Sequence, residues 1–293
     1  MKGRTELETF KKLTGELALV TGASSGFGLL ICLELAAKGY NVAAAMRRPE
    51  AAGELLSSAK EAGLESRIHI MKVDVCEHEL IKNAMLEIDH RWGRLDLLVN
   101  NAGEAVGGFV EEVPLEAWRK QMDVNFFGTV AVTQLALPIM RKTPKSKIIF
   151  MSSISGVVGF PGYGPYASSK FAIEGLAECL SLELQPLGMD VVLIEPGAYG
   201  TPIWSKGFSD IKAKEGSPYY SMLNRVLRFS QKTAEKSGDP REVARLVGEI
   251  ARSASPKFRY RLPFGTRMTI AAKMMLPYRF FRRIVLNTLS KNP

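Results

Sequence analysis

Short apolar runs recur along the chain and alternate with longer stretches in which apolar residues return every three or four positions. The short runs carry few charges, which is typical of strands buried on both faces of a parallel sheet. The longer stretches have the period of helices that cover such a sheet. The pattern predicts a single doubly wound α/β domain, with a mostly parallel seven-stranded sheet and helices on both faces. Strands are expected at 16–21, 41–46, 67–73, 95–100, 146–152, 190–195 and 257–261.

The regular alternation breaks after the sixth predicted strand. Residues 198–237 form an irregular insertion, in which a helix is expected at 218–232. Asp239-Pro240-Arg241-Glu242 then predicts a helix start, because Asp can cap a helix and Pro fits its first turn. We expect residues 1–256 to form the main domain, with the insertion as a lid over a substrate site. Residues 257–293 are expected to be a basic extension and not an independent domain.

A glycine-rich turn joins the first predicted strand to the first predicted helix. Thr21-Gly22-Ala23-Ser24-Ser25-Gly26-Phe27-Gly28 precedes an apolar helical run from Leu29 to Ala37. Glycines let the backbone turn tightly and approach a pyrophosphate, which then lies at the helix N-terminus. In this position the turn favours nucleotide binding over a purely structural role.

The same turn also fits the G-x-S-x-G pattern of a hydrolase nucleophile, with Ser24 as the serine. That arrangement needs an Asp or Glu and then a His later in the chain. The histidines are His69, His78 and His90, so nothing after residue 90 could serve as the base. We therefore favour nucleotide binding.

Tyr166 and Lys170 are four residues apart in a predicted helix and therefore share one face. A free phenol has a pKa of about 10 and is a poor acid–base catalyst at neutral pH. A fixed positive charge nearby favours the phenolate, so we expect Lys170 to lower the pKa of Tyr166. The pair could then exchange a proton with a carbonyl or alcohol oxygen.

Further motifs follow the glycine-rich turn in a fixed order. They are Asn100-Asn101-Ala102-Gly103 after a strand, Asp123-Val124-Asn125 in a helical stretch, Ser153 thirteen residues before Tyr166, and Pro196-Gly197 followed by Thr201. Together with Tyr166 and Lys170 they make residues 14–255 resemble the short-chain dehydrogenase/reductase family. In its general sequence character, the chain is most similar to the branch of 17β-hydroxysteroid and retinol dehydrogenases. The resemblance implies a Rossmann fold and a catalytic domain that binds NADP.

The resemblance implies that hydride passes between a nicotinamide and a substrate carbon. Tyr166 would exchange the proton, and Lys170 would bind the nicotinamide ribose. Ser153 would hydrogen-bond the substrate oxygen, and Asn125 would hold a water that links Lys170 to solvent. The spacing to Tyr166 selects Ser153 over Ser152 and Ser155. Tyr163 is set aside because Ala167, not a lysine, lies four residues further on.

The resemblance also implies a set of cofactor-binding residues. Asp74 would contact the adenine, Asn101 to Gly103 would pack on the adenosine side, and Thr201 would bind the carboxamide. The full set is Gly22, Ser24, Ser25, Gly26, Phe27, Gly28, Arg47, Arg48, Asp74, Val75, Asn101, Ala102, Gly103, Tyr166, Lys170, Pro196, Gly197 and Thr201.

The end of the second predicted strand indicates which dinucleotide is preferred. A chain that prefers NAD carries Asp or Glu here to bind the ribose 2′-hydroxyl, whereas a basic residue accommodates a 2′-phosphate. The sequence reads Met46-Arg47-Arg48-Pro49, and no acid occurs until Glu50. We therefore expect NADP(H) to be preferred over NAD(H).

The net charge of +9 lies entirely in the extension. From Lys257 to Pro293 there are nine basic residues and no acid, which leaves 30 Lys and Arg against 30 Asp and Glu in residues 1–256. Two interpretations stay open for this basic amphipathic segment. It could dock on anionic lipid, or it could pack across the substrate cleft or a partner subunit. No nucleic-acid recognition module is evident.

Other features of the sequence narrow the function classes. Cys32, Cys76 and Cys179 are far apart and are expected to be buried free thiols, and the histidines form no metal motif. We see no signal peptide and no apolar run near the ~20 residues that span a bilayer. We expect a cytoplasmic protein, with membrane association open, that forms a homodimer or homotetramer.

The first functional hypothesis is an NADP(H)-dependent enzyme that interconverts a lipophilic ketone or aldehyde and its alcohol. The alternative is a dinucleotide-binding membrane-surface or regulatory protein without relevant turnover. An epimerase or dehydratase of nucleotide sugars would share the Tyr and Lys, but such enzymes usually carry a larger C-terminal substrate region.

Overall fold

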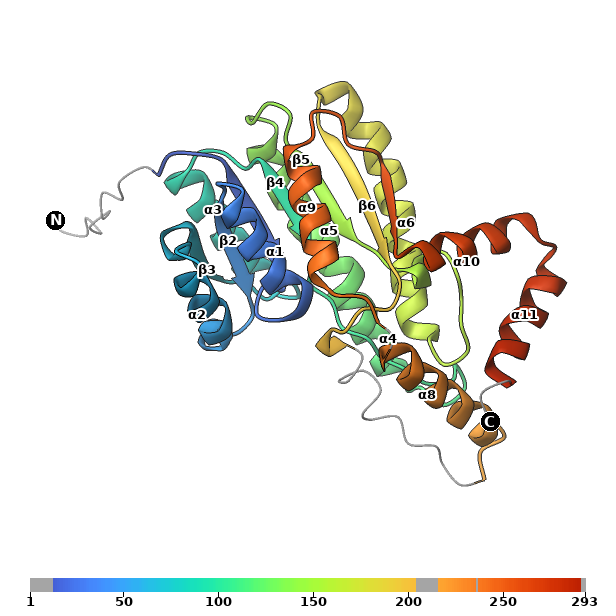
Figure 1. Cartoon of the computed structure of the whole chain (residues 1–293). Helices are drawn as coiled ribbons and strands as arrows, with labels where there is room; N and C mark the ends of the chain where they lie inside the picture. Colours follow the sequence, from blue (N-terminus) through green and yellow to red (C-terminus); the bar gives the residue numbers. More distant parts are fainter. Residues whose placement is uncertain (1–12, 204–215, 236, 291–293) are drawn as a thin grey trace.

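Seven strands form one sheet in the computed structural model, which describes residues 13–203, 216–235 and 237–290. Each adjacent pair in this described sheet is parallel. The seven strands that the apolar runs predict are confirmed, with ends that differ by two residues or less. Their order across the sheet is β3 (Ile68–Lys72), β2 (Asn41–Met46), β1 (Leu17–Thr21), β4 (Leu97–Asn100), β5 (Lys147–Met151), β6 (Asp190–Pro196) and β7 (Arg259–Leu262) (Figure 1).

Helices cover both faces of the sheet, as a doubly wound fold requires. Side chains alternate along β1, so that Ala18 and Val20 join one core and Leu17 and Leu19 the other. The first core is covered by α1 (Gly26–Ala37), α2 (Gly53–Glu61) and α9 (Arg241–Arg252). The second is covered by α3 (His78–Arg91), α5 (Gly128–Met140) and α6 (Gly164–Leu184).

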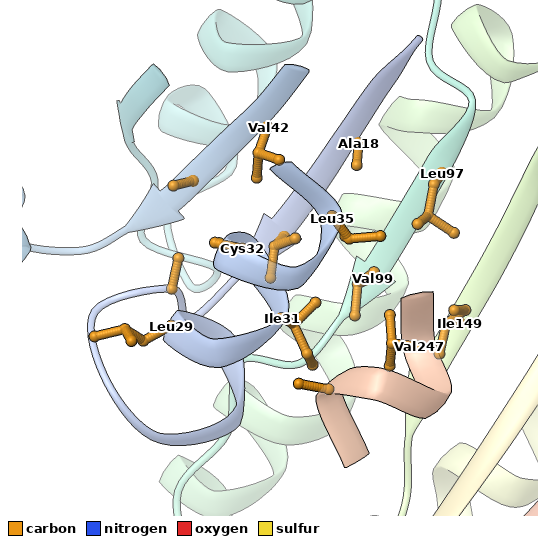
Figure 2. Close-up of a cluster of buried hydrophobic side chains, with 14 of the residues drawn as sticks. Ala18, Leu29, Ile31, Cys32, Leu35, Val42, Leu97, Val99, Ile149 and Val247 are labelled. Atoms are coloured by element: carbon orange, nitrogen blue, oxygen red, sulfur yellow. The ribbon is translucent and has the colours of Figure 1, made fainter. Parts of the chain in front are cut away.

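The core between the sheet and α1 fixes the helix whose N-terminus carries the glycine-rich turn. Ile31 and Leu35 of α1 point toward Val99 and Leu97 of β4, and Val247 of α9 lies beside them (Figure 2). Burying each large apolar side chain contributes about 1.5–3 kcal/mol. The start of α1 is therefore held rigidly against the ends of the central strands.

The helix α4 (Leu115–Met122) continues into α5 through a π-helical turn at Asp123–Phe127. The combined run Leu115–Met140 is long and apolar enough to cross a membrane by length and composition. The expectation that no such run exists is therefore wrong. Val132, Ala136 and Met140 are buried in the second core. The apolar residues of this run therefore pack against the sheet as part of the domain.

The segment after β6 contains the predicted helix, observed as α8 (Tyr220–Glu235). The helix α9 begins at Arg241, and Asp239 Oδ1 accepts the Arg241 N–H at 2.9 Å, as the helix-start pattern predicts. Residues 204–215 and 236 of the predicted lid lie outside the described residues. The lid stays a prediction.

The basic extension begins inside the sheet, because β7 is the edge strand beside β6. Two helices follow, α10 (Phe264–Met275) and α11 (Tyr278–Ser290). Figure 1 shows them as an arm that leaves the sheet beyond β7 and turns back toward α8. The first part of the extension therefore completes the domain.

The cysteines differ from their expected burial. Cys32 is buried in α1, but Cys76 and Cys179 are exposed. Cys179 lies on the outer face of α6, which the sequence pattern alone did not distinguish from its inner face. His69 lies in β3 as predicted, and His78 and His90 are exposed on α3.

Candidate active site

A cavity of about 480 Å³ opens at the carboxyl ends of the strands. Residues that directly follow β1 and β4 face each other there. These strands are neighbours in the sheet but not in the sequence, and doubly wound sheets bind ligands at such a point. The predicted residues on its wall are Gly22, Ser24, Ser25, Gly26, Phe27, Arg47, Arg48, Asp74, Val75, Asn101, Ala102, Gly103, Ser153, Tyr166, Lys170, Pro196, Gly197 and Thr201. Gly28 and Asn125 do not line it.

The glycine-rich turn adopts backbone conformations that favour glycine, with φ of +68° at Gly22 and +57° at Gly26. A Cβ on Gly22 would stand 2.8 Å from Ala102 Cα, and one on Gly28 would stand 2.2 Å from the Gly22 oxygen. Gly28 therefore does not contact the cavity. Because it has no side chain, α1 can begin in direct contact with the glycine-rich turn. The Ser25 side chain makes no capping hydrogen bond, so the N–H groups of the first turn suit an anionic group.

Thr21 ties the ends of β1 and β4 together. Its hydroxyl oxygen accepts the backbone N–H groups of Asn101 and Ala102, both at 3.0 Å. Asn101 Nδ2 returns a hydrogen bond to the Thr21 carbonyl at 2.8 Å. Thr21 was not predicted as a site residue, although its place as the last residue of β1 was an available signal.

Ser153, Tyr166 and Lys170 meet on the cavity wall, as their spacing predicts. The Ser153 hydroxyl lies near Tyr166 as a hydrogen-bonding group that lowers the pKa of the phenol. Ser153 Oγ also accepts the Ser155 N–H at 3.1 Å, so the Ser153 proton can be donated toward Tyr166. Lys170 Nζ lies 5.6 Å from the centroid of the Tyr166 ring and donates to the Met151 carbonyl at 2.8 Å. Tyr163 lies apart, with its hydroxyl 2.8 Å from Ser230 Oγ of α8.

Burial shifts the pKa values of Tyr166 and Lys170 in opposite directions. Burial raises the pKa of Tyr166 to about 12, and the Ser153 hydrogen bond lowers it only in part. Burial lowers the pKa of Lys170 to about 8. The charge of the nearby Glu174 carboxylate has the opposite effect and raises this pKa. In the protein alone burial sets the direction of the Tyr166 pKa, and no effect of Lys170 on it is resolved, so the lowering of this pKa by Lys170 stays a prediction.

Asn125 lies within the π-helical turn and is 1% exposed. Its Nδ2 donates to the Glu104 carbonyl and to Ser169 Oγ, both at 3.0 Å. Its Oδ1 accepts the Glu104 N–H at 2.9 Å. Asn125 therefore fixes the loop after β4 to α6 from behind the wall, and its link to Lys170 through water stays a prediction.

A buried acid one turn beyond Lys170 was missed by the sequence analysis. Glu174 accepts a hydrogen bond from Ser152 Oγ and pairs with Arg259 Nη2 at 3.0 Å. Arg259 Nε lies 2.8 Å from the fully buried Glu195 of β6. Burial raises the pKa of Glu174 to about 7, with the Ser152 hydrogen bond opposing it. The signal was present, because residues 170 and 174 share a helix face.

The wall suits an extended dinucleotide. The basic side chains Arg47 and Arg48 follow β2 at one end, and Lys170 lies at the other. The glycine turn and the start of α1 lie between them. Asp74 Oδ1 accepts the Cys76 N–H at 3.0 Å, which fixes the turn after β3. A Cβ on Gly197 would stand 2.3 Å from Thr266 Oγ1, so this glycine lets the turn after β6 pack against α10.

The residues that line the cavity do not support a serine hydrolase or a metal site. Ser24 lines the cavity, but His69, His78 and His90 do not, so no base stands beside it as a hydrolase requires. Within the part of the chain that the structure describes, no group of three or more His, Cys, Asp or Glu could hold a metal ion.

The fold, the glycine turn and the Ser153–Tyr166–Lys170 set define a dinucleotide-dependent oxidoreductase. The family model for short chain dehydrogenases matches residues 16–212. The chain belongs to the short-chain dehydrogenase/reductase family, whose members act on CH–OH and carbonyl groups with a nicotinamide cofactor.

Three bacterial relatives align over most of the chain. An uncharacterized oxidoreductase of Bacillus subtilis, YusZ, is 41% identical over 94% of this chain and 98% of its own length. A 3-ketodihydrosphingosine reductase of Bacteroides thetaiotaomicron is 33% identical over 89% and 93%. An NADPH-dependent 3-dehydrocapnine reductase of Ornithobacterium rhinotracheale is 35% identical over 94% and 97%.

Members of the predicted branch of the family are also among the similar proteins. The 17-beta-hydroxysteroid dehydrogenase type 1 of Mus musculus is 32% identical over 83% of this chain and 72% of its own. Among solved structures, a short-chain dehydrogenase from Streptomyces avermitilis superimposes with a TM-score of 0.76 at 28% identity, covering 96% of this chain and 97% of that chain.

Proposed function

We propose that this protein is an NADP(H)-dependent oxidoreductase that interconverts a lipophilic ketone or aldehyde and its alcohol. The observation that carries the proposal is the buried group of Ser153, Tyr166 and Lys170 at one end of a wall that carries Arg47 and Arg48 at the other. The names of three relatives refer to ketones or alcohols of steroid or lipid type, which supports a lipophilic substrate.

The proton chemistry of the proposal follows from the acidities of the site. A bound nicotinamide would supply or accept the hydride. With its pKa raised to about 12, Tyr166 is a neutral phenol at pH 7 and can give its proton to a carbonyl oxygen. Ser153 can donate a second hydrogen bond to the same oxygen as negative charge develops there.

Lys170 is placed to support that proton transfer. Its hydrogen bond to Met151 fixes the ammonium beside the Tyr166 ring. With a pKa lowered to about 8, Lys170 is mostly charged at pH 7 and loses its charge as the pH rises through 8. We therefore expect the rate of carbonyl reduction to fall along an alkaline limb near that pH.

The cofactor preference rests on Arg47 and is tested by titration with NADPH and NADH, following nicotinamide fluorescence. We expect NADPH to bind at least tenfold more tightly, about 1.4 kcal/mol, because a guanidinium can bind a 2′-phosphate through paired hydrogen bonds. The variant Arg47→Asp should lose most of that preference.

The matched control for this substitution is Arg141→Asp, which changes an exposed arginine away from the cavity wall. It should leave both affinities unchanged. Equal or tighter binding of NADH by the wild-type protein would overturn the assignment of Arg47.

Glu174 is proposed as a positioning residue that keeps Lys170 charged. In Glu174→Gln the Ser152 hydrogen bond can persist, but the negative charge that raises the Lys170 pKa is removed. We expect the alkaline limb of the kcat profile to move to lower pH by about one unit.

The control for Glu174→Gln is Glu178→Gln, one turn further along α6. Glu178 also pairs with Arg259, at 2.9 Å, but its charge does not act on Lys170. The pH profile of kcat for Glu178→Gln should match that of the wild type. Identical profiles for all three proteins would reduce Glu174 to a structural role.

A further inference from the structure

The helices α10 and α11, residues Phe264–Ser290, form a C-terminal arm whose inner side packs close to the active site. Val158, Ile270 and Phe281 make a small buried cluster there. Lys273 Nζ of α10 also donates a hydrogen bond to the Val157 carbonyl. The arm is therefore anchored on residues 154–160, the segment that directly follows Ser153.

The opposite face of α10 is apolar and exposed. Phe264, Met268 and Met275 are 71%, 62% and 82% exposed. Positions 264, 268 and 275 fall on one face of a helix, away from the buried Ile270. Large apolar side chains this exposed, gathered on one face, mark an interaction surface.

The helix α11 adds both apolar and basic side chains to the exposed part of the arm. Phe281 and Leu289 are buried, whereas Tyr278, Phe280 and Ile284 are exposed. The exposed basic residues are Arg279, Arg282 and Arg283. Met, Phe and Tyr side chains beside arginines on an amphipathic helix are typical of segments that lie in a lipid–water interface.

Charge identifies the occupant of this surface. No acid occurs from Lys257 to Pro293, and the nine basic residues of this segment equal the net charge of +9 of the whole chain. A second copy docked by two-fold symmetry would bring the same basic surface against itself. An anionic bilayer satisfies both the arginines and the apolar side chains, because its headgroups are negative and its acyl region is apolar.

We propose that the C-terminal arm docks on the surface of an anionic lipid bilayer. Phe264, Met268 and Met275 enter the boundary of the acyl region, and the arginines of α11 bind headgroup phosphates. Because the arm is anchored beside Ser153, docking brings the substrate side of the domain near the membrane. This last consequence rests on the proposed function: a lipophilic carbonyl compound can then pass from lipid to the site.

The test is flotation of the full chain with vesicles of phosphatidylcholine alone and of phosphatidylcholine with added phosphatidylglycerol. We expect binding to the anionic vesicles to be at least about tenfold stronger and to weaken as salt is added. Two double variants separate the contributions: Met268→Glu with Met275→Glu, and Arg282→Glu with Arg283→Glu. Each should lose at least about tenfold in vesicle binding.

The matched control is Leu86→Glu with Lys82→Glu on α3, where Leu86 is 60% exposed and Lys82 is also exposed. It should bind vesicles like the wild type, and thermal unfolding checks that every variant is folded. The proposal is overturned if the wild type ignores anionic vesicles or if the arm variants bind them unchanged. Loss of self-association in the methionine variant, without vesicle binding by the wild type, would assign the arm to a second copy. No cofactor or substrate is needed, so failure of the proposed enzyme activity would leave this result untouched.

Discussion

Replacing Tyr166 with Phe is expected to reduce turnover by about 10²–10⁴-fold, the range typical for loss of a general acid. The phenol is the group with a transferable proton that the structure places on the cavity wall beside Ser153 and Lys170. Phe keeps the ring that packs beside Lys170 and removes only the hydroxyl. Binding of NADPH should therefore change by less than about 1 kcal/mol.

The result separates the two functional hypotheses. Loss of turnover with retained cofactor binding supports an enzyme in which Tyr166 transfers the proton. Full biological function of Tyr166→Phe would favour a protein that binds the dinucleotide without relevant turnover. Tyr163→Phe is the matched control, because Tyr163 lies near the start of the same helix and bonds Ser230 of α8 instead.

Replacing Gly28 with Ala is expected to destabilise the fold by about 3 kcal/mol, at the upper end for an overpacked site. The added Cβ would stand 2.2 Å from the Gly22 oxygen and 2.6 Å from Asn101 Nδ2. Neither neighbour can move easily, since one is backbone and the other holds β4 to β1 through Thr21. Urea unfolding measures the loss, and NADPH titration should show weakened binding as the turn is displaced.

Gly53→Ala is the control for this prediction. A Cβ there meets nothing within 4 Å, and the residue has helical dihedral angles at the start of α2. Ala should be neutral or stabilise by about 0.5–1 kcal/mol, through the unfolded state. Equal stability of Gly28→Ala and the wild type would contradict the close approach of α1 to the turn.

The fold could be predicted because its signal is local. Each strand is a short apolar run, and the strand-to-helix alternation leaves few topologies for a parallel sheet. Ser153 was identified by its spacing from Tyr166, and the cavity wall contains it together with Lys170. The roles of the individual cofactor residues stay predictions.

The features that sequence reasoning missed depend on burial and on distant residues. The direction of the Tyr166 pKa follows from its burial, which a helical spacing does not reveal. Glu174 gains its partner from Arg259, 85 residues away and on another strand. Cys179 was expected to be buried, but it lies on the outer side of α6. Such facts arise only when the elements pack together.

The central claim is hydride transfer from NADPH to a lipophilic carbonyl carbon. The most direct measurement uses NADPH deuterated at C4 of the nicotinamide, with a panel of steroid and long-chain ketones, and analyses the products by mass spectrometry. We predict an alcohol that carries one deuterium at the former carbonyl carbon with the wild-type protein, and almost none with Tyr166→Phe. Tight NADPH binding with no transfer of deuterium to any ketone would contradict the proposed function.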